Sequence, residues 1–206
     1  MMDLYAKLTQ IYKNKADWKN VIDDVGACLN ETDTKVKAKA IWILGEIGLA
    51  HGTLVEPYVA TIAANLKSDD ELLRERALNA VGRIGRNDFK MIEPWFEEIF
   101  SAAQDPCEKV RIAFIWACEN IGTSFPELFE TRMSYFLPLL DDKIDKVRME
   151  APEFFRVIGK RKPEYVKEYL PKLMNLAEQD SNRVVRIHAL GAVKAAGAKD
   201  LCSIDK

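Results

Sequence analysis

The chain has 206 residues, of which 48% are hydrophobic and 30% are charged, and its formal net charge at pH 7 is −2. This is the composition of an ordinary water-soluble protein with enough apolar material for a core. The slightly acidic balance argues against a protein whose main role is to coat nucleic acid. No run approaches the roughly 18 apolar residues of a membrane-spanning helix, so we expect no membrane association.

Four cysteines are scattered along the chain without a Cys-x-x-Cys pair, namely Cys28, Cys107, Cys118 and Cys202. This usage is typical of reduced thiols in a cytoplasmic protein rather than of disulfides or a zinc site. The N-terminal residues carry a charge every few positions and lack the apolar core of a signal peptide. We therefore expect a cytoplasmic protein without a structural metal.

The first predicted element covers residues 3–13. Leu4, Leu8 and Ile11 recur at helical spacing, which predicts a short amphipathic helix. This helix precedes a repeated pattern, and stacked repeats need a terminal unit with a polar outer face. We interpret residues 3–13 as an N-terminal capping helix.

From residue 36 onward one pattern returns at a fixed interval. Each copy begins with an apolar residue, the anchor, which is followed directly by a basic residue. A small or apolar residue lies four positions after the anchor, and in most copies Ile and Gly lie eleven and twelve positions after it. The pattern starts at positions 36, 73, 110, 147 and 185, which are separated by 37, 37, 37 and 38 residues. A period of this size indicates stacked structural repeats. Because one repeat can bury its apolar face only against its neighbours, we expect residues 1–206 to form a single domain.

Each repeat is predicted to contain two helices joined by a short acidic turn. Pro57 and Pro94 should lie in the first turn of a first helix, whereas Pro138 and Pro171 fall later and predict bends. The glycines at positions 48, 85, 122, 159 and 197 are expected to end the second helices in the left-handed conformation. The predicted pairs cover residues 17–48, 54–85, 89–122, 125–159 and 163–198.

An acidic residue lies five positions before three of the anchors. Asp105 and Asp142 precede Val-Arg pairs in this way, as does Asp180. This arrangement resembles the HEAT-repeat family, whose members serve mostly as protein-binding scaffolds. The resemblance covers residues 17–199 and implies an all-α, right-handed α-α superhelix of about five HEAT-like helical pairs behind the capping helix.

The resemblance also implies a ladder of ion pairs between neighbouring repeats. Its members would be Asp105, Asp142 and Asp180 on the acidic side and Arg74, Arg111, Arg148 and Arg186 on the basic side. Glu31 with Lys37, and Ser68 in the next repeat, depart from the pattern, so the ladder is expected to be irregular there. The alternative is a set of ordinary exposed charges, each contributing under about 1 kcal/mol.

In such superhelices the second helices line the concave surface, and this implies a binding groove. Positions 3, 6 and 10 after each anchor should face outward, where Trp and Arg are typical of binding hot spots. We expect Trp42, Arg76, Asn79, Arg83 and Trp116 at the centre of the groove; in the alternative, both tryptophans pack between repeats. The full set of candidate residues is Lys39, Trp42, Glu46, Arg76, Asn79, Arg83, Trp116, Asn120, Glu150 and Glu153.

The pattern favours a non-catalytic scaffold that binds a protein or peptide and needs no cofactor. His51 and His188 lie far apart in a repeat stack, and no nucleophile–base pair or metal-ligand spacing is present. Glu119 could approach Glu150 and Glu153, which we interpret as ordinary surface carboxylates.

Two other functions stay open. One alternative is a HEAT-like DNA-binding protein or alkylpurine DNA glycosylase, although nucleic acid is disfavoured by the charge. A second is a HEAT-like chromophore lyase. The C-terminal repeat, ending near Leu201, Cys202 and Ser203, is a candidate for self-association.

Overall fold

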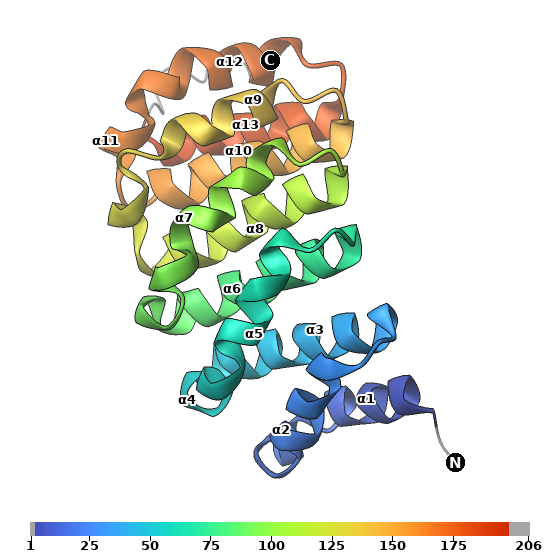
Figure 1. The fold of residues 1–206 in the computed structure, drawn as a ribbon. Coiled ribbons are helices and arrows are strands. Elements are labelled where there is room, and N and C mark those ends of the chain that lie inside the picture. The colour runs from blue at the N-terminus through green and yellow to red at the C-terminus, as the bar shows by residue number, and fades with distance from the viewer. Residues whose placement is uncertain (1–2, 198–206) are drawn as a thin grey trace. The chain divides into compact units, whose positions relative to one another are not determined.

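The computed structural model describes residues 3–197, and all regular structure within this range is helical. The chain divides into two compact units, Met1–Ala102 and Ala103–Lys206. We refer to them as the N-terminal unit and the C-terminal unit, and Figure 1 shows the helices of each.

The N-terminal unit alternates long helices with runs of short α and 3₁₀ segments (η). Its elements are α1 (Leu4–Lys13), η1 (Lys15–Asp17), α2 (Trp18–Ala27), η2 (Cys28–Asn30), α3 (Thr34–Ala50), α4 (Gly52–Val55), η3 (Glu56–Tyr58), α5 (Val59–Ala64), η4 (Asn65–Lys67), α6 (Glu71–Asn87), η5 (Phe89–Met91), η6 (Glu93–Trp95) and α7 (Phe96–Ile99), followed by η7 (Phe100–Gln104).

The C-terminal unit has the same alternation. Its elements are α8 (Glu108–Ser124), η8 (Pro126–Phe129), η9 (Met133–Phe136), α9 (Leu137–Leu140), α10 (Asp145–Gly159), α11 (Pro163–Val166), η10 (Lys167–Tyr169), α12 (Leu170–Gln179) and α13 (Arg183–Ala195).

The predicted second helices are present as the long helices α3, α6, α8, α10 and α13, but the predicted first helices are divided. The one expected near residues 54–66 consists of α4, η3, α5 and η4. Pro57 lies at the start of η3, where its missing N–H interrupts the regular hydrogen bonding of the preceding turn. The bends predicted at Pro138 and Pro171 are absent, because each proline lies in the first turn of a new helix, α9 or α12.

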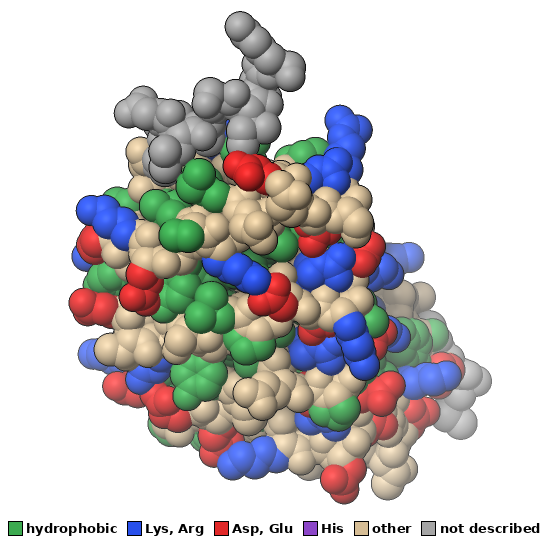
Figure 2. All heavy atoms as spheres, turned by 90° about the horizontal axis from the view of Figure 1, so that it is seen from above, with side chains coloured by type: hydrophobic (Ala, Val, Ile, Leu, Met, Phe, Trp, Pro, Cys, Tyr) green, Lys and Arg blue, Asp and Glu red, His purple; other side chains and the backbone are tan. Residues whose placement is uncertain are grey.

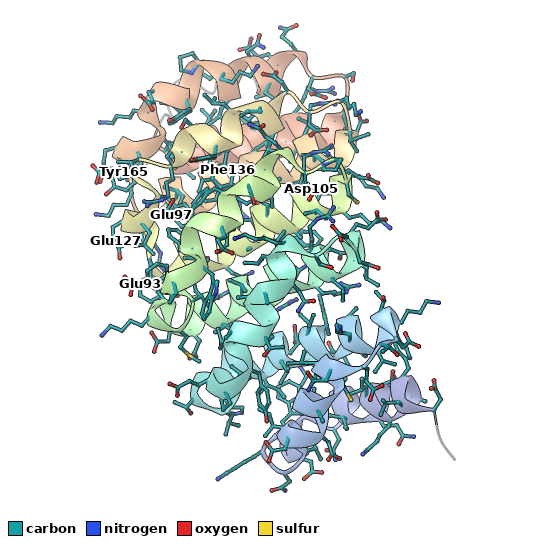
Figure 3. The ribbon with its side chains drawn as sticks, viewed as in Figure 1. Glu93, Glu97, Asp105, Glu127, Phe136 and Tyr165 are labelled. Atoms are coloured by element: carbon teal, nitrogen blue, oxygen red, sulfur yellow. The ribbon has the colours of Figure 1, made fainter. Side chains whose placement is uncertain are left out.

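The long helices of successive repeats pack side by side and carry most of the core. In the N-terminal unit α3 packs against α6, and in the C-terminal unit α10 packs against both α8 and α13. The C-terminal core is rich in phenylalanine. The ring of Phe136 (labelled in Figure 3) lies with its centroid 5.0 Å from that of Phe114 and 3.5 Å from that of Phe154. All three rings are fully buried.

The predicted left-handed helix end is confirmed for Gly197, which follows α13 with a φ of 85°. No other described glycine has a positive φ, so the prediction is wrong for positions 48, 85, 122 and 159. Gly48 and Gly122 lie inside α3 and α8, where a Cβ atom would come within 2.5 Å of Ile84 and 2.8 Å of Ile158, respectively. These glycines therefore allow the close approach of neighbouring helices rather than closing a helix end.

Two ladder pairs link successive turns in the C-terminal unit. Arg111 binds Asp142 with two parallel hydrogen bonds, Nε to Oδ2 at 2.7 Å and Nη2 to Oδ1 at 3.0 Å. Arg148 binds Asp180 in the same way, at 2.8 and 3.4 Å. The side chains of Arg111 and Asp142 are each only 9% exposed. Their burial separates them from ordinary surface charges.

Each ladder arginine also binds its own turn. The Nη1 group of Arg111 donates to the carbonyl of Asp105 at 2.7 Å, and that of Arg148 to the carbonyl of Asp142 at 2.7 Å. Arg186 binds the Asp180 carbonyl at 2.6 Å. In the N-terminal unit Arg74 binds the Ser68 carbonyl at 2.8 Å. These contacts satisfy turn carbonyls that the helices leave unpaired.

Burial and ion pairing act in opposite directions on Asp180. Desolvation alone would raise the pKa of Asp180, but the hydrogen bond from Arg148, the Asn182 backbone N–H and the charge of Arg148 outweigh it and lower the pKa. The folded state therefore stabilises the ionised carboxylate.

Replacing Gly45 with Ala is expected to destabilise the protein by about 1–3 kcal/mol, because the new Cβ would lie 2.7 Å from the Ala80 backbone and push α3 from α6. Gly191→Ala is the matched control, since its Cβ would meet nothing closer than Arg156 at 3.4 Å. That control should gain about 0.5–1 kcal/mol from helix propensity. Urea unfolding measures both, and similar gains for the two variants would contradict the close-packing role.

Arg111→Met is expected to destabilise the protein by about 3 kcal/mol, because it leaves the Asp142 carboxylate buried without its cation. Lys172→Met removes the more exposed Lys172–Asp141 pair and should cost under about 1 kcal/mol. Chemical denaturation of the two variants distinguishes a ladder from scattered charges. An equal, small loss in both would show that the ladder contributes little.

Candidate binding surfaces

The outward residues of α3 and α6 form a cationic and aromatic surface in the N-terminal unit. Trp42 on α3 is half-buried. The guanidinium carbon of Arg76 lies 5.0 Å from the centroid of its ring, and that of Arg83 lies 4.1 Å away. Both arginines come from α6. Such cation–π contacts fix the indole in position while leaving part of its surface accessible.

Glu46 completes the support of Trp42 from its own helix. Its carboxylate forms an ion pair with Arg83, with Oε1 lying 2.9 Å from Nε. The exposed fraction is 16% for the Arg83 side chain and 17% for the Glu46 side chain. Desolvation lowers the pKa of Arg83, and the charge of Glu46 partly offsets this. Arg83 is thus held between the carboxylate and the indole.

A hollow of about 280 Å³ opens beside Trp42. Lys39 is half-buried there, with its ammonium 4.9 Å from the centroid of the Tyr12 ring and 5.9 Å from that of Tyr5. Burial, and then the charge of Arg76, lower the pKa of Lys39. The residues that line the hollow are Tyr5, Lys35, Ala38, Lys39, Trp42, Leu72 and Arg76.

The prediction that Asn79 lies at the centre of this surface is wrong, because the residue is buried. Its side chain is 5% exposed, and its amide donates to the Glu75 carbonyl of its own helix at 3.0 Å. The short amide folds back onto the backbone one turn earlier, and it is not accessible to a partner.

The outward residues of α8 and α10 form an acidic and aromatic surface in the C-terminal unit. Trp116 on α8 is 39% exposed, and its Nε1 donates to Oε2 of Glu150 on α10 at 2.9 Å. The Asn120 amide donates to the Trp116 carbonyl at 2.9 Å. The indole is therefore anchored at its polar edge while much of the ring faces solvent. The alternative with both tryptophans packed between repeats does not describe Trp116.

Trp42 and Trp116 are placed within different units. Each indole has its own charged surroundings, cationic around Trp42 and acidic around Trp116. A single groove that contains both stays a prediction.

Glu119 belongs to the acidic surface, and its interpretation as an ordinary surface carboxylate is wrong. Its Oε1 atom is buried and has no hydrogen-bond partner among the described residues. Burial, and then the charges of Glu150 and Glu153, raise the pKa of Glu119 from 4.5 to about 8, against the opposing charge of Arg156. Helical spacing predicts that these carboxylates can approach one another, but it does not indicate how deeply Glu119 is buried.

Glu153 has closer basic partners than Glu119. Arg156 Nε donates to its Oε2 at 2.6 Å, and His188 Nδ1 on α13 lies 3.7 Å from its Oε1. The same His188 nitrogen is 2.7 Å from the Met149 carbonyl, which favours the tautomer protonated at Nδ1. Glu153 is therefore a paired carboxylate.

Within residues 3–197, no cluster of three or more His, Cys, Asp or Glu residues could hold a metal ion. Cys28, Cys107 and Cys118 are free thiols, and burial raises the pKa of Cys118. In the described part of the chain, no helix combines the length and apolar character needed to cross a membrane.

The predicted self-association end, at Leu201, Cys202 and Ser203, lies outside the described residues. On α13, Val184 is 36% exposed and Ile187 is 53% exposed. Figure 2 shows hydrophobic side chains interspersed with charged ones.

Glu119→Gln is expected to change how stability depends on pH. Because the folded-state pKa of Glu119 is raised to about 8, its favourable contribution is complete below its ordinary pKa of 4.5 and is lost as the pH rises through 8. Between about pH 5 and pH 9 the wild type should lose about 1–3 kcal/mol relative to Glu119→Gln.

Urea unfolding across this pH range measures the difference, with Glu178→Gln on exposed α12 surface as the control. A difference between wild type and Glu119→Gln that does not vary with pH would contradict the buried, neutral carboxyl.

The comparisons with known proteins bear on the fold. No protein-family model matches the chain, and no curated protein matches it in sequence. Solved structures do. A designed armadillo repeat protein in complex with the peptide (KR)4 is similar with a TM-score of 0.73 and 21% identity, over 93% of this chain and 91% of that one.

Two further structures agree. One of the computationally designed armadillo repeat proteins for modular peptide recognition is similar with a TM-score of 0.70 and 20% identity, over 93% of this chain and 91% of that one. An engineered protein gives a TM-score of 0.71 at 16% identity, over 94% of this chain and 89% of the other. At this identity the likeness shows the fold alone, and that fold is an all-α helical-repeat solenoid.

Proposed function

We propose that this chain is a non-catalytic module that binds peptide or protein segments on the outward faces of its long helices. The observation that carries the proposal is the pair Trp42 and Trp116. Each lies six residues after its repeat anchor, and each presents an indole that is at least partly accessible and held by charged neighbours. Aromatic and arginine side chains held in this way are typical of binding hot spots.

The similar structures support a binding role in general terms. Two of them are described as designed for, or solved with, a bound peptide. A repeat fold presents equivalent side chains at regular intervals along a face, which suits an extended peptide with its own regular spacing. We extend this mode of binding to the present chain as part of the proposal.

Within the helical-repeat class we infer a HEAT-like repeat with an armadillo-like feature. The arginine–aspartate contacts of Arg111 and Arg148 favour the HEAT resemblance. The divided first helices give each repeat additional short segments, and armadillo repeats contain three helices where HEAT repeats contain two.

The DNA glycosylase alternative gains no support from the N-terminal surface. Its tryptophan and arginines are accompanied by Glu46, and that carboxylate is paired with Arg83 at 2.9 Å. We keep DNA as a competing ligand in the experiments below.

A peptide library displayed on phage and selected on the intact chain is expected to yield binders that depend on the tryptophans. For selected peptides, Trp42→Ala or Trp116→Ala should weaken affinity about tenfold or more, which corresponds to at least about 1.4 kcal/mol. Calorimetric titration measures this loss.

Tyr135→Ala is the matched aromatic control, because Tyr135 is 45% exposed on η9 rather than on a long helix. It should change affinity less than about twofold. Selection of no peptide, or of peptides insensitive to both tryptophan variants, would count against the proposed function.

A further inference from the structure

We propose that the hollow beside Trp42 binds the carboxylate side chains of an acidic peptide segment. This inference rests on the proposed function and names the ligand class for one of its surfaces. The expected occupant is a peptide rich in Glu or Asp.

The charges around the hollow are the first support. Three cations line it, Lys35, Lys39 and Arg76, and the lining includes no carboxylate. Within the described part of the chain, Lys35 and Lys39 have no ion-pair partner. Arg76 has one, the adjacent Glu75, at 3.0 Å. The hollow is therefore locally positive on a chain whose net charge is −2.

The burial of Lys39 is the second support. Its ammonium lies against two tyrosine rings, and both desolvation and the nearby Arg76 disfavour its charged form. An anion placed between Lys39 and Arg76 would relieve this repulsion. A bound carboxylate would then gain more here than at an exposed lysine, because the site is partly shielded from water.

The walls of the hollow suit a side chain that is apolar up to its charged end. Tyr5 is 43% exposed, and with Trp42, Ala38 and Leu72 it supplies apolar surface for methylene groups. The hollow, at about 280 Å³, lies at the lower limit of ligand pockets, which suits one or two side chains better than a cofactor.

The support of Trp42 is already in place without a ligand. Arg83 holds the indole on one side and is itself held by Glu46. A wall that is fixed before binding lowers the entropic cost of association.

Charge complementarity separates the candidate partners. A basic peptide such as the (KR)4 of the similar designed protein would be repelled by Lys35, Lys39 and Arg76. Tight binding to a nucleic acid draws on many phosphate contacts along a basic track, and three cations around one small hollow do not make such a track. An acidic peptide needs only the contacts that the hollow offers.

The test uses the intact chain and fluorescence polarisation with labelled octaglutamate, octaglutamine, (KR)4 and a single-stranded DNA of equal charge to octaglutamate. We expect octaglutamate to bind at least about tenfold more tightly than the other three, with affinity falling as salt rises from about 50 to about 300 mM. Equal binding of octaglutamine, or tighter binding of the DNA or of (KR)4, would overturn the proposal.

Variants then locate the site. Lys39→Met and Arg76→Met should each weaken octaglutamate binding about tenfold. Lys19→Met is the control, since it removes the same charge from an exposed position on α2 outside the hollow, and it should have less than about a twofold effect. Equal losses in all three would mean that only net charge matters, and the proposal would be wrong.

The two proposals can fail separately. If library peptides bind and depend on Trp116 while octaglutamate does not bind, the acidic-ligand inference fails and the proposed function stands. If neither binds, both fail. Comparison of octaglutamate with octaglutamine needs no variant, so the inference stays testable even where a substitution prevents folding.

Discussion

The structure depends on an arginine that makes two kinds of contact at once. Arg111 binds the carbonyl of its own turn and the carboxylate of Asp142 in the next, and Arg148 repeats this with Asp180. A planar guanidinium with two parallel hydrogen bonds accepts little rotation. The contact therefore sets the register between successive turns, and with it the register of the long helices that follow them. Outward side chains of α8 and α10 meet for this reason, as Trp116 and Glu150 do.

The repeat itself could be predicted because its cause is local and periodic. An apolar anchor followed by a basic residue marks the start of each long helix, and the 37-residue spacing places α3, α6, α8 and α10 within a few residues of their observed bounds. The division of the first helices was harder to predict, since it depends on where each proline finds a turn that tolerates a missing N–H. The prediction for Gly48 and Gly122 is wrong for a related reason. A helix end and a close helix contact both favour glycine, and the sequence alone does not distinguish the two uses.

At the candidate surfaces, the direction in which a side chain leaves its helix could be predicted, whereas the extent of its burial could not. Helical spacing predicted correctly that Trp116 points outward. It failed for Asn79, whose short amide finds an acceptor in its own helix, and for Glu119, whose Oε1 atom is buried. The helical period indicates the direction in which a side chain leaves the helix. How far the neighbours then cover it depends on their length and conformation, which a repeat pattern does not contain.

The two units place an indole at the same repeat position but surround it with opposite charge. Around Trp42 the neighbours are Arg76 and Arg83, and beside Trp116 they are Glu150 and, deeper, Glu119. In both places part of the charge is disfavoured by burial, which shows in the lowered pKa of Lys39 and the raised pKa of Glu119. A fold selected for stability alone would replace such groups, since an ionisable side chain that is buried without full pairing lowers the free energy of unfolding. Proteins keep local departures of this kind mainly at functional sites, where a ligand of the opposite charge recovers the cost. The two surfaces therefore differ in the charge of the ligand that each would suit.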